Sequence, residues 1–156
     1  MAVSAEKIDR QMAAFEAACR GRGLKVTHQR TEVFREVAGT EEHPDAETVF
    51  ERVRRRIPAI SRDTVYRALA FLEDLGLVRR VDLLSGRARF DANDDAHHHV
   101  ICRRCGAVRD FTSTALDGFR PPKSVAAWGE IEAVQIQLRG LCAKCSAQQA
   151  APKRSG

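Results

Sequence analysis

Hydrophobic residues in the first half of the chain recur with the period of amphipathic helices. Residues 7–20 lack glycine and proline and predict a first helix, which the Gly-Arg-Gly sequence at 21–23 ends. A second helix is predicted to begin after Thr27, a residue type that suits an N-cap. After a polar break at residues 41–44, apolar residues at helical spacing predict a third helix over 45–56.

A short turn and a fourth helix follow directly. Residues 57–60 form the predicted turn, and Ser61 is the candidate N-cap of a helix that carries apolar residues on one side. Helix, four-residue turn and helix is the spacing of a helix-turn-helix. Two predicted strands, 77–83 and 87–90, then flank a turn at 84–86 and indicate a β-hairpin. A helix-turn-helix followed by a hairpin predicts a winged helix.

The character of the chain changes at residue 91. Short strands are predicted at 99–101 and 107–111, and residues 131–138 alternate between apolar and polar side chains as a strand does. This pattern is typical of a small α/β domain, so the chain as a whole is predicted to be α+β. Nothing after residue 146 is apolar enough to fold. The predicted organisation is a DNA-binding domain over 1–90, a second domain over 91–146 and a disordered tail over 147–156.

Composition and charge argue against a membrane protein and leave nucleic-acid binding open. The chain has 156 residues and no long apolar run, so no membrane span is predicted. Residues 1–7 lack an apolar signal core, which predicts a cytoplasmic location. The net charge of +5 is weak evidence by itself, but six arginines and one acid, Asp63, fall between Arg52 and Arg67. Such a run fits either a solvated helix face or contacts to phosphates and guanine edges.

Two Cys-x-x-Cys pairs are the strongest chemical signal in the chain. They are Cys102 with Cys105 and Cys142 with Cys145. Four thiolates in two such pairs can close a tetrahedral zinc site with no open position, which is a structural role. The reducing cytosol favours metal ligands over disulfides. The fifth cysteine, Cys19, lies in an alanine-rich helical stretch and is interpreted as a packing residue.

Histidine and aspartate residues, whose nitrogen and oxygen donors are harder metal ligands than thiolates, precede and follow the first cysteine pair. In an extended segment His97 and His99 point to one side and His98 to the other, so the first two are the candidate co-ligands. Asp91 and Asp110 flank them, either as further ligands or as a turn acid and a strand-end acid. Imidazoles combined with carboxylates fit Fe(II), Mn(II) or Zn(II).

Five motifs in a fixed order resemble the Fur family over about residues 10–146. They are Thr-Val-Tyr-Arg-Ala-Leu at 64–69, His43-Pro44, Arg89-Phe90-Asp91, the His-x-His-x-x-Cys-x-x-Cys run from His97 to Cys105, and the late pair Cys142 and Cys145. The resemblance implies a dimeric bacterial repressor with an N-terminal winged helix and a C-terminal α/β dimerisation domain. It also implies a regulatory metal that sets operator affinity, and hence a homodimer that binds double-stranded operator DNA.

The resemblance assigns a role to each ligand. By similarity, the structural zinc ligands are Cys102, Cys105, Cys142 and Cys145, and the regulatory ligands are His43, Asp91, His97, His99 and Asp110. Aspartate at both carboxylate positions is similar to the peroxide-sensing PerR branch, whereas iron-sensing Fur proteins usually carry glutamate. A third family metal site uses a histidine where this chain has Val134. Pro121-Pro122 interrupts a region where relatives carry a longer dimer helix.

A PerR-like member would repress with Fe(II) or Mn(II) bound and would sense hydrogen peroxide sacrificially. The Fe(II) form reduces H2O2 and one of its own ligands, His43 or His99, is oxidised, so that metal and operator are both lost. Such a protein is not an enzyme and takes no small organic substrate. The alternatives within the fold are an iron-responsive Fur or a zinc-responsive Zur. Two alternatives belong to other functional classes. One is a non-haem iron enzyme, since two histidines and a carboxylate also form an oxygenase triad. The other is a zinc-stabilised scaffold without a sensing role.

The helix over residues 61–75 is the predicted reader of the DNA major groove. Tyr66 and Arg67 are the candidates for base contacts, with Arg62 near the helix start, because an arginine fork to guanine is the commonest specific contact. Arg67 departs from known peroxide sensors, which carry asparagine at that position, and this difference bears on the operator sequence.

Overall fold

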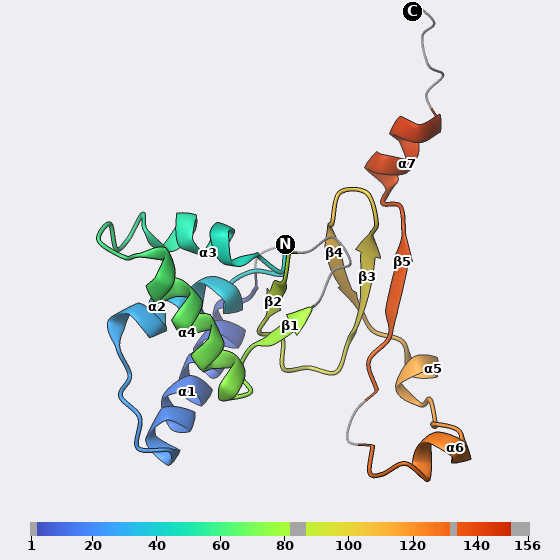
Figure 1. The fold of residues 1–156 in the computed structure, drawn as a ribbon, viewed down its shortest axis with the longest axis horizontal. Helices are drawn as coiled ribbons and strands as arrows, with labels where there is room; N and C mark the ends of the chain where they lie inside the picture. The colour runs from blue at the N-terminus through green and yellow to red at the C-terminus, as the bar shows by residue number, and fades with distance from the viewer. Residues whose placement is uncertain (1–2, 82–86, 132–133, 151–156) are drawn as a thin grey trace, which may run out of the picture. The chain divides into compact units, whose positions relative to one another are not determined.

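The structure, a computed structural model of the chain, describes residues 3–81, 87–131 and 134–150. It divides into two compact units, Met1–Asp94 and Asp95–Gly156. The first unit contains four helices and two strands among its described residues. They are α1 (Ala5–Gly21), α2 (His28–Ala38), α3 (Ala46–Val53), α4 (Arg62–Asp74), β1 (Arg79–Val81) and β2 (Arg89–Asp91) (Figure 1).

Each helix of the first unit begins at a side-chain cap. The hydroxyl groups of Ser4, Thr27 and Ser61 and the carboxylate of Asp45 accept hydrogen bonds from the backbone N–H three residues on, which satisfies donors that a helix start leaves unpaired. The caps predicted at Thr27 and Ser61 are confirmed. The third helix is shorter than predicted, because Arg56 and Ile57 both donate to the Val53 carbonyl and so close the helix in a turn.

Apolar side chains from all four helices form one core in the first unit. Phe15, Phe34, Leu69 and Leu72 are its largest fully buried members, and the apolar side of α4 packs into it. Tyr66 lies on the opposite side of α4 and is 54% exposed. The helix that carries the candidate base-reading residues is therefore held from behind by the core.

The hairpin that follows α4 is an antiparallel pair of short strands. Gly76 adopts a φ of 71°, a left-handed conformation that glycine adopts without strain, where the chain leaves α4. Arg80 of β1 then pairs with Phe90 of β2. This is the predicted winged-helix arrangement. The first strand begins at Arg79 instead of residue 77, and the second covers 89–91 instead of 87–90, while residues 82–83 of the first predicted strand lie outside the described residues. The turn predicted at 84–86 lies outside the described residues.

The second unit is built on a three-stranded sheet in the order β4-β3-β5, with the central strand antiparallel to β4 and parallel to β5 (Figure 1). Three helices accompany the sheet in the described part of this unit. The elements are β3 (His98–Cys102), β4 (Val108–Phe111), α5 (Thr114–Asp117), α6 (Lys123–Ala126), β5 (Gln137–Gly140) and α7 (Ala143–Ala150).

Two predictions for the second unit were wrong in part. The last strand begins at Gln137 instead of residue 131, and Leu138, expected on an apolar face, is 48% exposed. Residues 147–150, expected to be disordered, form the end of α7, while 151–156 lie outside the described residues. The Pro121-Pro122 pair precedes α6, where Pro122 is the N-cap, so only short helices flank it.

Candidate metal centres

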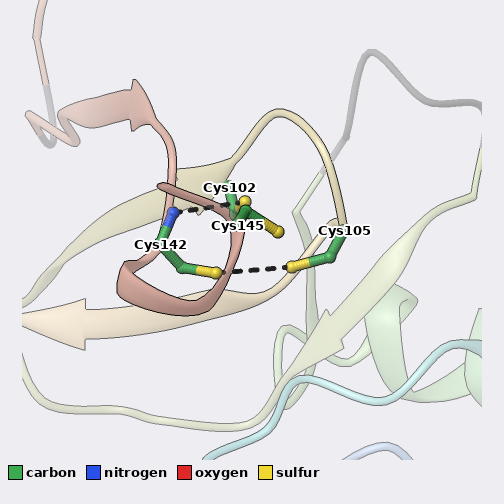
Figure 2. Close-up of side chains that lie close together, drawn as sticks. All are labelled: Cys102, Cys105, Cys142 and Cys145. Carbon is green, nitrogen blue, oxygen red and sulfur yellow. Dashed lines mark hydrogen bonds between the residues drawn. The ribbon is translucent and has the colours of Figure 1, made fainter. Parts of the chain in front are cut away.

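The parallel pairing of β3 and β5 brings the two cysteine pairs together. Cys102 is the last residue of β3 and pairs with Gly140 of β5, two residues before Cys142. Cys105 lies in the turn that leads toward β4, and Cys145 lies in the first turn of α7. The four side chains converge although almost forty residues separate the pairs (Figure 2).

The geometry of this cysteine cluster fits a tetrahedral metal. The four sulfur atoms lie within 4.8 Å of one another, and the Sγ atoms of Cys105 and Cys142 are 3.8 Å apart. A tetrahedral zinc with Zn–S bonds of about 2.3 Å separates its sulfurs by roughly 3.8 Å. All four cysteines are free thiols. The donors predicted from the two Cys-x-x-Cys pairs are thus all brought together.

The ionisation of the thiols also favours a bound cation. Backbone N–H groups of Cys105 and Cys142 lower the pKa of Cys102 to about 6, so this sulfur is a thiolate at neutral pH. Burial and the neighbouring sulfurs raise the pKa of Cys145 to about 12. Four thiolates at this spacing repel one another, so the cluster can ionise fully only around a cation.

A second set of donors lies in the same unit, at the start of β3. His97 and His99 are buried, and their Nε2 atoms are 3.1 Å apart. Metal–nitrogen bonds of about 2.1 Å at adjacent octahedral positions would place two nitrogens roughly 3.0 Å apart. Asp110, which pairs with His99 across β3 and β4, has Oδ1 3.4 Å from Nε2 of His99 and 3.8 Å from Nε2 of His97. The alternation predicted for His97 and His99 is confirmed.

Hydrogen bonds orient both imidazoles of this set. Nδ1 of His97 is 2.7 Å from the Asp95 carbonyl, which can only accept, so Nδ1 carries the proton and Nε2 is left with its lone pair. Nδ1 of His99 is 3.3 Å from the Gln135 amide. Gln135 was not a sequence candidate, because only the pairing of β3 with the chain before β5 places it beside His99.

The first unit supplies two further donors. His43 and Asp91 are both buried, and Nε2 of His43 lies 3.7 Å from Oδ1 of Asp91. Nδ1 of His43 is 2.9 Å from the Glu41 carbonyl, which again leaves Nε2 as the available nitrogen. His43 has a φ of 51°, the single positive value among the non-glycine residues that the structure describes. Strain of this kind tends to occur where a side chain has a functional role.

His98 has a different environment from its two neighbours. It is buried, its Nδ1 accepts from the Ile136 backbone N–H at 3.3 Å, and its Nε2 lies 3.0 Å from Oδ1 of Asp117. The sequence placed His98 away from the other two histidines, and the structure agrees. Asp117 gave no sequence signal, since it lies in a short helix that no periodicity marks.

The candidate base-reading residues lie on the exposed side of α4. Arg67 is 3.0 Å from Asp63 one turn earlier, and both side chains are mostly exposed. Arg62 forms a forked pair with Glu47 of α3, with its NH2 group 2.7 Å from Oε1, and its guanidinium lies over the Phe50 ring. Tyr66 and Arg67 are thus accessible, whereas Arg62 is already engaged within the first unit.

Residues 21–139, more than half of the chain, match the family model described as the ferric uptake regulator family. The chain belongs to the ferric uptake regulator (Fur) family. Members of this family are transcriptional regulators, as the resemblance implied. No helix in the described part of the chain is long and apolar enough to cross a membrane.

The relatives and solved structures that the chain resembles include regulators named for different signals. The chain is 28% identical to the peroxide-responsive repressor PerR of Staphylococcus epidermidis, over 93% of this chain and 97% of that protein. The structure resembles a Campylobacter jejuni peroxide stress regulator with a TM-score of 0.68 and 26% identity, over 81% of this chain and 95% of that one. It also resembles a zinc uptake regulator solved with zinc and DNA, with a TM-score of 0.62 and 28% identity, over 92% and 98%.

Proposed function

We propose that this protein is a metal-dependent repressor that senses hydrogen peroxide through oxidation of its own histidine ligands. The observation that carries the proposal is the donor set around His99, in which two buried imidazoles and a partly buried carboxylate face one another. PerR relatives that match nearly the whole chain support the peroxide signal over other family signals. Derepression of oxidative-stress genes would follow from loss of operator binding.

The proposed regulatory ligands are His43, Asp91, His97, His99 and Asp110, and the proposed ion is Fe(II) or Mn(II). In His43 and His97 a backbone carbonyl accepts a hydrogen bond from Nδ1, which leaves the lone pair on Nε2. In His99 the Gln135 amide lies beside Nδ1, and Nε2 faces His97 and Asp110. Two of these proposed ligands belong to the first unit and three to the second, so a bound metal would couple the two units. Metal binding would therefore favour one DNA-binding conformation.

Bound iron would supply electrons to reduce peroxide, and the oxidant formed would act on the nearest imidazole. His43 and His99 are the proposed targets, because the resemblance to PerR proteins implies oxidation at these two positions; both side chains are buried. Addition of one oxygen to the ring removes its ability to ligate. A Mn(II) form would repress but would resist peroxide. Because the reaction consumes the protein, it is not enzymatic turnover.

The proposed partners are double-stranded operator DNA and a second copy of the chain in the cytoplasm. Tyr66 and Arg67 support DNA reading because they are exposed on α4, with Arg62 as the third proposed contact if its pair with Glu47 opens. A homodimer is supported by large apolar side chains exposed on the second unit. Among the described residues they are Val100, Phe119, Val125, Trp128, Ile131 and Leu138. We also propose that the four clustered cysteines bind a structural zinc.

Titration with Fe(II), Mn(II) and Zn(II) under anaerobic conditions, followed by operator binding, tests this function. We expect Fe(II) and Mn(II) each to activate binding of protein that already holds one zinc per chain. Activation of operator binding by Zn(II) alone would favour a zinc-responsive, Zur-type regulator. Operator binding that does not change with any added metal would contradict metal sensing and would indicate a scaffold that zinc only stabilises.

A further inference from the structure

A buried polar residue interrupts the apolar side of α1. Gln11, Phe15 and Cys19 are the buried residues of this helix and follow one another at four-residue intervals, so all three face the core of the first unit. The side-chain amide of Gln11 donates to the backbone carbonyl of Ala92, and its Oε1 has no hydrogen-bond partner in the part of the chain that the structure describes. Burying a half-satisfied amide is costly, so the contact with Ala92 calls for a reason.

Gln11 is one of three α1 side chains that reach three consecutive residues. Nζ of Lys7 donates to Oδ1 of Asn93 at 2.7 Å, and Arg10 lies 3.7 Å from Asp94. Residues 7, 10 and 11 share one face of a helix, since they are three and four positions apart. One face of α1 therefore holds the whole segment 92–94 just after β2.

The held segment in turn orients Asp91. The backbone N–H of Asn93 donates to Oδ1 of Asp91 at 2.7 Å, and the same carboxylate faces Nε2 of His43. Asp91 and Ala92 are both buried, while Asn93 is fixed at its side chain by Lys7. The contacts run without a gap from α1 through Asn93 to the Asp91 carboxylate.

We propose that α1 positions Asp91 for the regulatory metal, with Lys7 and Gln11 as positioning residues. This inference rests on the proposed function, in which Asp91 is a ligand. Groups that hydrogen-bond a metal ligand fix its orientation, and their loss typically weakens metal binding by about 10–100-fold. Lys7 acts through the Asn93 side chain, and Gln11 acts through the Ala92 backbone, so each contributes separately to holding the carboxylate.

The test uses the full chain with zinc bound and the variants Lys7→Met and Gln11→Met. Methionine keeps most of the side-chain length and removes the donor, which limits the packing loss. Mn(II) affinity is measured directly, from the electron paramagnetic resonance signal of free Mn(II), without DNA. We expect each variant to bind Mn(II) about 10–100-fold more weakly with unchanged zinc content. Lys7→Arg, which can still donate to Asn93, is expected to keep the wild-type affinity.

Glu16→Gln provides the matched control, since Glu16 is exposed on the same helix and outside these contacts. A purely structural role for Lys7 and Gln11 would lower the thermal midpoint of the variants but leave the Mn(II) affinity of the folded protein unchanged, and this result would overturn the proposal. Asp91→Ala distinguishes failure of the proposed metal site from failure of the positioning role of α1. If Asp91→Ala itself retains Mn(II) binding, the regulatory site is wrong, and the inference that depends on it fails for that reason.

Discussion

Replacing Cys142 with serine is expected to release the zinc and unfold the second unit. The residue lies between the end of β5 and the start of α7, and its backbone N–H donates to Sγ of Cys102. The second unit has a small sheet, and among the described residues it buries far fewer apolar side chains than the first unit does. Binding of a structural zinc supplies about 10–16 kcal/mol in small zinc domains, so loss of one ligand removes a stabilisation that this sheet cannot replace.

Zinc content and an amide correlation spectrum measure this effect together. We expect the zinc to fall well below one per chain and the signals of the second unit to lose dispersion, while the first unit keeps its own. Cys19→Ala is the matched control, because Cys19 is buried in the core of the first unit, whereas the four cysteines of the cluster belong to the second. A Cys142→Ser protein that holds one zinc and a folded second unit would show that the cluster is not the structural site.

Replacing His99 with alanine is expected to abolish metal-dependent operator binding without releasing the structural zinc. His99 is fully buried, and its Nε2 faces both His97 and Asp110. Removing a direct ligand should weaken Mn(II) binding by more than the roughly 10–100-fold typical of residues that only support a ligand. The chain would then fail to reach its DNA-binding conformation at metal concentrations that saturate the wild type.

His98→Asn is the control that the sequence itself offers, since His98 is adjacent and equally buried but directed to Asp117. Asparagine can still accept from the Ile136 backbone N–H, which His98 does through Nδ1. Operator binding with added Mn(II) should persist in His98→Asn and disappear in His99→Ala. Equal loss in both variants would mean that this strand is needed for folding and that ligation by His99 is not what the assay reports.

The elements that positioned most of the candidate residues could be predicted from local patterns. The helices of the first unit have strong caps and apolar periodicity, and Thr27 and Ser61 begin helices as expected. The two cysteine pairs were recognisable because a metal site constrains residue type and spacing together. The alternation of His97 and His99 followed from strand geometry alone.

Features that depend on pairing between distant segments were missed. The position of β5 is set by its register with β3, which the alternation over residues 131–138 does not contain. The contact of Gln135 with His99 follows from that same register, whereas Asp117 contacts His98 from α5. Gln11 reads as an ordinary polar residue on a helix, and only the neighbouring Ala92 carbonyl shows why it is buried. Long-range contacts of this kind leave no local periodicity.

The central claim, a sacrificial peroxide sensor, is tested most directly by anaerobic loading of the zinc-containing protein with Fe(II) followed by a small molar excess of H2O2. Operator binding is measured beside the masses of peptides that contain His43 and residues 97–99. The proposal predicts one added oxygen on a histidine and loss of operator binding, and neither change in the Mn(II) form. Unmodified histidines together with operator binding that still depends on metal would contradict it and would indicate an iron- or zinc-responsive regulator instead.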